Sequence, residues 1–444
     1  LYKKRKMNWE ALLSLRRHGD TTKRIRKEQD EIRLGFEVDY DRIVFSSYFR
    51  SLQDKTQVIP FSKTDFVHTR LTHSLEVSVV ARSLGRLAGK ELLKRHPHLQ
   101  EIHGYQPNDF GAIVAAAALA HDIGNPPFGH SGEKAIGHYF ESGEGKQFQA
   151  HLTKEEYEDL CRFEGNANGF KLLTESMEGT PGGLRLSYAT LGAYMKYPKG
   201  SLPRKPTAHV ADKKFGYFQS EKKFFAEIAR EMELTKGTGN NRHPLAFLVE
   251  AADDICYTII DFEDGINLGW ISEDFALEYL IKLVKDHMDT EKYAGLKHTA
   301  QRMSYLRSLA INSLILDAVN MFLAHEEEIL AGTFSHALLD KSKYKAQMDD
   351  IIAISIDKVY RSDEVLQKEI VGYKVISTLL SAFCTAAVNK LHHSTSPYDE
   401  LILRLIPKGT PMVEESLYKT VLNASCFVAS LSDGKAMELA KKMN

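Results

Sequence analysis

HDIGNPPFGHSGE, residues 121–133, is the stretch that decides the fold of this 444-residue chain. It follows an apolar helical pattern over residues 109–121 and places two histidines and two acids within thirteen positions. An adjacent His-Asp pair offers a metal ion one neutral nitrogen and one hard anionic oxygen. Mg²⁺, Mn²⁺ and Fe²⁺ accept such mixed ligands more readily than a structural zinc site would. The stretch therefore predicts part of a metal site whose other ligands come from elsewhere in the chain.

A first distant segment that can supply a ligand is RLTHSLEV, residues 70–77. Thr69 or Thr72 can cap a helix that starts here, and apolar residues recur at helical spacing through Leu87. This pattern turns His73 toward the interior. A single histidine at a helix start could instead satisfy a backbone group.

A second distant segment is AADDICYTIID, residues 251–261, which is too apolar for a solvated helix yet carries three acids. Asp253, Tyr257 and Asp261 follow one another at intervals of four residues and share one helical stripe. Buried carboxylates need a cation or hydrogen-bond donors to offset desolvation. Helical phase favours Asp253 as the ligand and Asp254 as a salt-bridge or capping acid, although Asp253 alone could also be an interhelical salt-bridge partner.

The order His, His-Asp, Asp resembles the HD superfamily of metal-dependent phosphohydrolases, and further segments narrow the resemblance to the deoxyguanosine triphosphate triphosphohydrolase (dGTPase) family. The resemblance spans most of the chain and implies an all-α fold, with an HD-domain helical core, appended helical lobes and few short strands. The segments that carry it, besides those quoted above, are QDKTQV (53–58), RFEGNANG (162–169), GAYMKYP (192–198), KKFGYFQSE (213–221), HPLAFLVEAADDICYTIIDFED (243–264), AGTFSHALL (331–339) and GYKVISTLL (372–380).

The resemblance implies a reaction in which dGTP and water become deoxyguanosine and inorganic triphosphate, by attack of a metal-activated water at the α-phosphate. The expected ion is Mn²⁺ or Mg²⁺, with Fe²⁺, Co²⁺ and Ni²⁺ as alternatives. Four protein ligands leave an octahedral ion two positions for water and a phosphate oxygen. The expected ligands are His73, His121, Asp122 and Asp253.

His130 and Glu133 lie nine and twelve residues after His121, beyond a Gly-Asn-Pro-Pro turn that can fold the chain back toward the metal. We expect a general acid/base pair in which Glu133 holds the imidazole of His130 in one tautomer. The proton could belong to the attacking water or to the departing 5′-oxygen. In the alternative interpretation, His130 ends a loop and Glu133 pairs with a lysine such as Lys134.

A triphosphate carries about four negative charges near neutral pH, so the site needs cations besides the metal. Arg70 lies one helical turn before His73 and can reach a phosphate beside the metal. The resemblance adds further substrate contacts at Asn125, Lys196, Tyr197 and Lys214. Each cation taken alone could be an ordinary surface residue.

The resemblance also implies a sugar pocket that accepts a 3′-hydroxyl and crowds a 2′-hydroxyl. Its expected residues are Gln53, the ring of Tyr257, and Asp261 as acceptor from the 3′-OH. Gln53 could instead be a surface residue and Tyr257 core filler. Glu369 resembles a position near the guanine edge, but residues 386–411 depart from the family pattern, which places guanine selectivity in question.

Helical periodicity recurs along most of the chain, and its composition, 43% hydrophobic and 26% charged, is that of a globular protein. We expect a basic N-terminal arm and helix over residues 1–40, a catalytic core over 41–270, and a C-terminal helical region over 271–444 that contributes to the base pocket and to oligomerisation. The predicted helices cover residues 9–17, 41–53, 71–95, 109–121, 132–141, 154–178, 220–232, 244–266, most of 272–331, and the chain from about 338 except around 397 and 406–411.

Residues 1–27 carry ten lysines and arginines against two acids, an excess of eight positive charges in a chain whose net charge is −1. This arm could contact phosphate or a neighbouring subunit, or be a solvated tail. The resemblance implies a homo-oligomer, with hexamers among the relatives, and single-stranded DNA as a regulatory ligand. Apolar runs shorter than a bilayer span and the lack of a secretory signal predict no membrane partner and a cytoplasmic location.

Two other functions remain open at this stage. One is a related enzyme of broader specificity, either a general dNTP triphosphohydrolase or an HD-type nucleotide phosphomonoesterase. The other is a non-catalytic scaffold that senses nucleotide or DNA, which loss of a ligand or of the acid/base pair would favour. All six of those residues are present.

Overall fold

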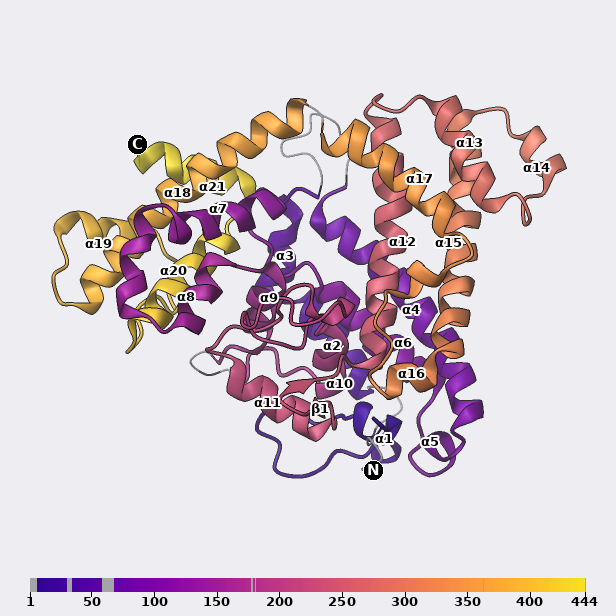
Figure 1. The fold of residues 1–444 in the computed structure, drawn as a ribbon, viewed down its shortest axis with the longest axis horizontal. Coiled ribbons are helices and arrows are strands. Elements are labelled where there is room, and N and C mark those ends of the chain that lie inside the picture. The colour runs from indigo at the N-terminus through magenta and orange to yellow at the C-terminus, as the bar shows by residue number, and fades with distance from the viewer. Residues whose placement is uncertain are drawn as a thin grey trace.

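The computed structural model describes residues 6–29, 34–57, 68–176, 179, 181–361 and 363–443. It confirms the all-α class, because helices account for nearly all regular structure in this described part (Figure 1). The strands there are β1 (Thr235–Lys236) and β2 (Gly239–Asn240), which pair antiparallel as one short hairpin. The few short strands expected from the sequence are therefore this single hairpin.

Four long helices form the centre of the molecule: α4 (Arg70–Arg95), α6 (Pro107–Ala120), α12 (Pro244–Asn267) and α15 (Thr299–Ala324) (Figure 1). Small residues let α4 and α6 approach closely. A Cβ at Gly85 would lie 2.6 Å from the carbonyl oxygen of Phe110, and one at Gly89 would meet the Phe110 ring at the same distance. Because α6 consists mostly of buried alanine and other apolar residues, its end delivers the His-Asp pair into the interior.

The first two thirds of the chain also contain shorter helices. They are α1 (Trp9–Leu12), α2 (Gly35–Val44), α3 (Ser47–Arg50), α5 (His98–Glu101), α7 (Gly129–Glu141), α8 (Lys154–Cys161), α9 (Gly165–Thr174), α10 (Tyr188–Tyr194), α11 (Lys222–Glu231), α13 (Glu273–Val284) and α14 (Thr290–Gly295). Short 3₁₀ segments are η1 (Arg26–Glu28), η2 (Ser51–Asp54), η3 (Glu144–His151) and η4 (Val210–Asp212).

The C-terminal third contributes α16 (Glu326–Leu330), η5 (Leu338–Lys341), α17 (Lys345–Ser355), the π-helical turn η6 (Ile356–Tyr360), α18 (Asp363–Leu391), α19 (Pro397–Arg404), α20 (Leu417–Ser430) and α21 (Asp433–Met443). Helices α18, α20 and α21 share a second hydrophobic core with α7 and α8 from the middle of the chain (Figure 1). The turn after the His-Asp pair therefore lies between the central core and this second core.

Two predicted helices are wrong because each is interrupted. The helix predicted over 154–178 is divided into α8 and α9, since Glu164 takes an extended backbone conformation before Gly165. The helix predicted over 41–53 starts earlier, at Gly35, and ends at Val44, because extended Ser46 caps α3 by accepting from the backbone N–H of Phe49. Residues 177 and 178 of the first prediction lie outside the described residues.

The first helix is also shorter than predicted over 9–17, because it ends at Leu12. Ser14 and Arg16 use their backbone carbonyls to accept from the N–H groups of Ala189 and Tyr188 at the start of α10. The break expected around position 397 is present, because α18 ends at Leu391 and Pro397 begins α19. Its missing N–H is harmless at the first helical position, and Ser396 caps the helix.

In the N-terminal arm, the described residues are held to the body. Arg17 pairs with Asp39 at 2.6 Å, Arg26 pairs with Asp109 at 2.8 Å, and both arginines are buried. Much of the positive charge in this part of the arm is therefore neutralised by internal ion pairs. Residues 1–5 lie outside the described part.

Two helices, α15 and α18, are long and apolar enough to cross a bilayer by length and composition alone. About half of each apolar window is buried inside the fold, 56% and 50% respectively, as is common for core helices. Their composition is therefore weak evidence for a membrane span.

Candidate active site

His73, His121 and Asp253 form a compact cluster whose potential ligand atoms all lie within 4.8 Å of one another. His73 Nε2 lies 3.3 Å from Asp253 Oδ1, and His121 Nε2 lies 3.5 Å from the same oxygen. His73 is delivered by the first turn of α4, where Thr69 and Thr72 form a reciprocal capping box. Asp253 comes from the middle of α12 and His121 from the end of α6. Three segments far apart in the sequence thus meet at one point.

Asp122, the fourth expected ligand, stands beside this cluster. Its Oδ1 lies 3.5 Å from His121 Nε2 and accepts hydrogen bonds from Arg70 Nη1 at 2.9 Å and Asn125 Nδ2 at 2.6 Å. Its Oδ2 is buried and has no hydrogen-bond partner among the described residues. Asp254, the neighbour of Asp253, is not part of the cluster.

The electrostatics of the cluster favour ionised carboxylates. Burial alone would raise the pKa of Asp253, but the two histidines and Lys196 hold it well below its ordinary value. Burial likewise opposes ionisation of Asp122, and Arg70 and the histidines lower its pKa. A buried anionic oxygen without a partner and two imidazoles at this spacing fit a hard or borderline divalent ion.

His130 and Glu133, the two residues expected to act as an acid/base pair, are in contact at the start of α7. His130 Nδ1 lies 2.7 Å from Glu133 Oε2, while His130 itself is 78% exposed and lines a cavity of about 750 Å³. Glu133 is buried, and its other oxygen accepts from the backbone N–H of Gly165 at 2.7 Å. Burial would raise the pKa of Glu133, but His130, Lys214 and this N–H lower it to about 2. Lys134 is exposed and makes no ion pair within the described residues.

Arg70 lies between the His130–Glu133 pair and the cluster of candidate metal ligands. Its guanidinium holds Asp122, and a Cβ at Gly129 would lie only 2.9 Å from Arg70 Nη2. Gly129 has a positive φ of 59° and directly precedes His130. The start of α7 therefore rests against a buried cation beside the cluster.

The motif RFEGNANG has glycines at positions 165 and 169 because α9 packs closely against the turn that follows His121 and Asp122. A Cβ at Gly165 would collide with Asn125 Oδ1 and come within 3.0 Å of Glu133 Oε1. Gly124, at φ of 102°, lies against the backbone of Gly169 with no room for a side chain. These close contacts fix how near Asn125 and Glu133 lie to α9.

The two expected lysines lie on either side of the site. Lys196 Nζ is 3.6 Å from Asp253 Oδ2 and 3.7 Å from Glu250 Oε1. Lys214 Nζ is 2.8 Å from Glu164 Oε2 and 3.7 Å from Glu133 Oε2, and it lines the cavity at His130. Neither lysine is a freely solvated surface cation, since each side chain is about three-quarters buried.

On the expected sugar side, Tyr257 and Asp261 lie one and two helical turns after Asp253. Tyr257 stacks on Tyr360 from η6, with ring centroids 5.8 Å apart and planes 16° from parallel. The Tyr360 hydroxyl donates to Asp261 Oδ2, while Oδ1 is buried without a partner among the described residues. Burial raises the pKa of Asp261 to about 7.

The remaining predicted residues are more dispersed. Tyr197 is buried beside Lys196, and Gln53 is exposed on η2. Glu369 on α18 accepts from the Ser131 hydroxyl at 2.5 Å, one residue beyond His130. Val58, the last residue of the segment that contains Gln53, lies outside the described residues.

The sequence analysis missed several residues that shape the site. Lys55 is buried and donates to the carbonyls of Asn125 and Ala429 at 2.6 and 2.7 Å, and burial lowers its pKa to about 7. Asp433 accepts from the backbone N–H groups of Thr56 and Phe128. Lys55 lies inside the quoted motif QDKTQV, but the partners at 429 and 433 left no sequence signal.

A His, His-Asp, Asp set held together by an all-helical core defines an HD-domain phosphohydrolase, and the HD domain family model matches residues 70–257. The chain is 39% identical to a deoxyguanosinetriphosphate triphosphohydrolase-like protein of Synechocystis sp., covering 98% of this chain and 99% of that protein. It is 38% identical to a protein of the same description from Pseudomonas aeruginosa, over 98% of both chains. It is 32% identical to a deoxyguanosinetriphosphate triphosphohydrolase of Klebsiella pneumoniae, over 85% of this chain and 81% of that one. The chain belongs to the deoxyguanosinetriphosphate triphosphohydrolase family.

Proposed function

We propose that this protein hydrolyses dGTP to deoxyguanosine and inorganic triphosphate. The observation that carries the proposal is the cluster of His73, His121 and Asp253 beside the pair His130 and Glu133, with Arg70 between them. A divalent ion held there by these ligands and Asp122 would polarise a phosphate oxygen and lower the pKa of a water molecule.

The cations of the site match the charge of the polyphosphate. Arg70, Lys196 and Lys214 all approach the cluster or the acid/base pair, and each is now held by carboxylates. A bound triphosphate can take over these ion pairs, because it presents about four negative charges. The three cations thereby orient the α-phosphorus toward the attacking water and offset the negative charge of the triphosphate while the bond to the 5′-oxygen breaks.

His130 moves a proton at the attacking water or at the departing 5′-oxygen. Its exposed position at the mouth of the cavity leaves Nε2 accessible to substrate, while Glu133 occupies Nδ1. An ionised Glu133 stabilises the imidazolium that forms when His130 takes a proton. Attack at the α-phosphorus forms one P–O bond and breaks the bond to O5′, and the 5′-oxygen leaves protonated.

Tyr257 and Asp261 are suited to bind the deoxyribose. The free Oδ1 of Asp261 can accept from a 3′-hydroxyl, and the flat Tyr257 ring can pack under C2′ and exclude a 2′-hydroxyl. The same stripe of α12 carries Asp253, so sugar and α-phosphate are held by one rigid helix.

A broader dNTP triphosphohydrolase is the second candidate, and one contact favours it. Glu369 Oε1 already accepts a hydrogen bond from the Ser131 hydroxyl. The carboxylate therefore has fewer acceptor positions left for the N–H groups of a guanine. A strict guanine preference would need further groups near the base.

The test is to incubate the purified protein with Mn²⁺ and each of dGTP, dATP, dCTP, dTTP and GTP, and to separate the products by ion-exchange chromatography. We expect intact triphosphate and deoxyguanosine from dGTP. Comparable turnover of several dNTPs would assign the broader activity, and release of monophosphate or pyrophosphate would refute a triphosphohydrolase.

His121→Ala and Asp122→Ala should abolish turnover and lower Mn²⁺ affinity while the helical fold, measured by circular dichroism, persists. Full activity with the metal retained in either variant would refute the ligand assignment. Lys94→Ala, on the exposed far end of α4, is a control for general effects of substitution.

We also propose that the protein is a homo-oligomer. Exposed apolar residues lie near the start of α18 and, beyond its other end, on and just after α19, which supports a subunit contact at each of these two places. They are Leu366, Ile370, Val371, Tyr398, Leu401 and Leu405. Light scattering of the purified protein tests this, and a monomer at micromolar concentration would contradict it.

A single-stranded DNA ligand stays a prediction, which the internal pairing of the described arm arginines does not favour.

A further inference from the structure

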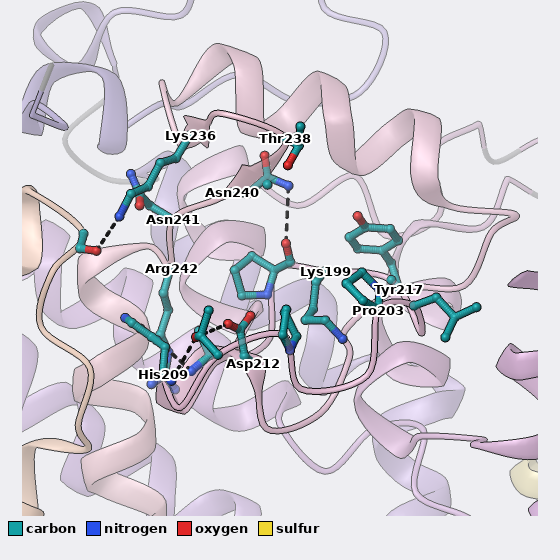
Figure 2. A pocket seen from close by; sticks show the side chains of 18 of the residues that line it. Lys199, Pro203, His209, Asp212, Tyr217, Lys236, Thr238, Asn240, Asn241 and Arg242 are labelled. Carbon is teal, nitrogen blue, oxygen red and sulfur yellow. Dashed lines mark hydrogen bonds between the residues drawn. The ribbon is translucent and has the colours of Figure 1, made fainter. Parts of the chain in front are cut away.

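A cavity of about 600 Å³ lies apart from the candidate active site, between the loop that follows Pro198, the β1–β2 hairpin and the segment around Phe334 (Figure 2). None of the predicted metal, acid/base or substrate residues lines it. Its volume falls in the range of small-molecule sites. It is therefore a separate place where a ligand can bind.

Positive charge prevails in the cavity walls. Four cations line it, Lys199, Lys222, Lys236 and Arg242, against the acids Glu155 and Asp212, which leaves an excess of two. Arg242 and His209 stand together at one end, Lys236 lies at the rim above them, and Lys199 lies across the cavity (Figure 2). Lys236 donates to the Gly332 carbonyl, and Asp212 accepts from Thr207.

Arg242 is the decisive residue because it is a buried cation with unused donors. It is 3% exposed, and its Nη1 donates to Glu250 at 2.7 Å. Its Nε and Nη2 are buried and have no hydrogen-bond partner among the described residues. One face of the guanidinium lies over the Phe247 ring, 4.5 Å from its centroid, so the group is held flat in one orientation. Unpaired buried donors of a cation are costly unless a ligand satisfies them.

Lys199 adds a second cation without a partner. It makes no ion pair or side-chain hydrogen bond within the part of the chain that the structure describes, although it is partly buried. Burial lowers its pKa, which an anion bound beside it would reverse. A planar arginine and a lysine that face one cavity form a typical phosphate site.

We propose that this cavity is a second binding site, which takes a small molecule that carries a phosphate group. The phosphate accepts from Nε and Nη2 of Arg242 and lies near Lys199. The apolar walls, which include Tyr217 and Phe247, leave room for an organic group attached to it. Free inorganic phosphate and an organic phosphate share this chemistry.

The site would be connected to the catalytic centre by a chain of charges. Arg242 pairs with Glu250, Glu250 Oε1 lies 3.7 Å from Lys196, and Lys196 lies 3.6 Å from Asp253 of the metal cluster. The existence of the second site does not depend on the proposed function, and its test reads binding directly.

The test is isothermal titration calorimetry, which measures the affinity and the number of sites when the full-length, metal-free protein is titrated with inorganic phosphate and, separately, with AMP. The host protein is the Lys214→Ala variant, which weakens anion binding at the catalytic site. We expect one site per chain in this host. Adding Lys199→Ala should weaken binding about tenfold, and adding Arg242→Lys, which removes the paired planar donors, by more than that. Lys223→Ala, an exposed neighbour that does not line the cavity, should leave binding unchanged.

Circular dichroism and thermal melting check that the variants fold. If Arg242→Lys does not fold, the double variant Lys199→Ala, Lys236→Ala carries the test, because neither lysine is enclosed in the core. Tighter binding of AMP than of phosphate would identify an organic phosphate as the ligand. Equal binding would identify the inorganic anion. Absence of binding in the Lys214→Ala host, or binding that survives the cavity substitutions, would overturn the proposal.

Discussion

His243 makes the stability of this protein sensitive to mild acid. It caps α12, the helix that carries Asp253, by accepting from the backbone N–H of Leu245 through Nδ1. Its Nε2 donates to the Leu12 carbonyl at 3.0 Å, so both nitrogens are used by the neutral ring. The residue is 1% exposed, and burial lowers its pKa from 6.5 to about 4.

The sign of the effect follows from proton binding. Between pH 6.5 and about 4 the unfolded chain binds a proton at His243 that the folded chain does not. Stability from this residue is therefore complete above pH 6.5 and is lost as the pH falls through that window. With these two pKa values the loss is about 2 kcal/mol at pH 5 and close to zero at pH 7.5.

The assay is urea unfolding in EDTA at pH 7.5 and pH 5, for the wild type and for His243→Asn. Asparagine keeps a capping acceptor but does not titrate, so the variant should gain about 2 kcal/mol relative to the wild type on going to pH 5. His151→Asn, at an exposed position, should show no such change. An equal difference between wild type and His243→Asn at the two pH values would refute the reasoning.

Three further substitutions test the site. Glu133→Gln should lower kcat by roughly 10²-fold with Mn²⁺ affinity unchanged, because an amide cannot stabilise a protonated His130; a wild-type kcat would leave Glu133 without a role in proton transfer. Gly165→Ala should lower unfolding free energy by about 1–3 kcal/mol through collision with Asn125 and should reduce kcat, whereas Gly295→Ala, with open space around it, should do neither; similar values for the two variants would refute the packing argument. Tyr257→Ala should let GTP compete in the dGTP assay, and continued rejection of GTP would move sugar selection elsewhere.

Periodicity alone predicted the parts of the site that lie within one helix, whereas the meeting of His73, His121 and Asp253 was expected from the family resemblance. The four-residue spacing of Asp253, Tyr257 and Asp261 sets their common stripe on α12, and Thr69 and Thr72 mark the start of α4. Helical geometry alone relates such residues, so periodicity is enough to find them.

Contacts between distant segments could not be predicted in this way. Lys55 finds its carbonyl partner at Ala429, and Asp433 holds Thr56, although more than 370 residues separate each pair. The stacking of Tyr360 on Tyr257 depends on a π-helical turn, for which composition gives no signal. The helix ends at Val44 and Cys161 were missed because Ser46 and Glu164 take an extended backbone conformation, and apolar periodicity gives no signal for it.

The central claim is that the protein hydrolyses dGTP by attack of water at the α-phosphorus. Its most direct test is to hydrolyse dGTP in ¹⁸O-labelled water with Mn²⁺ and to measure the masses of both products by mass spectrometry. Attack at the α-phosphorus predicts one ¹⁸O atom in inorganic triphosphate and none in deoxyguanosine. Label in the nucleoside, or products other than deoxyguanosine and triphosphate, would contradict the assignment.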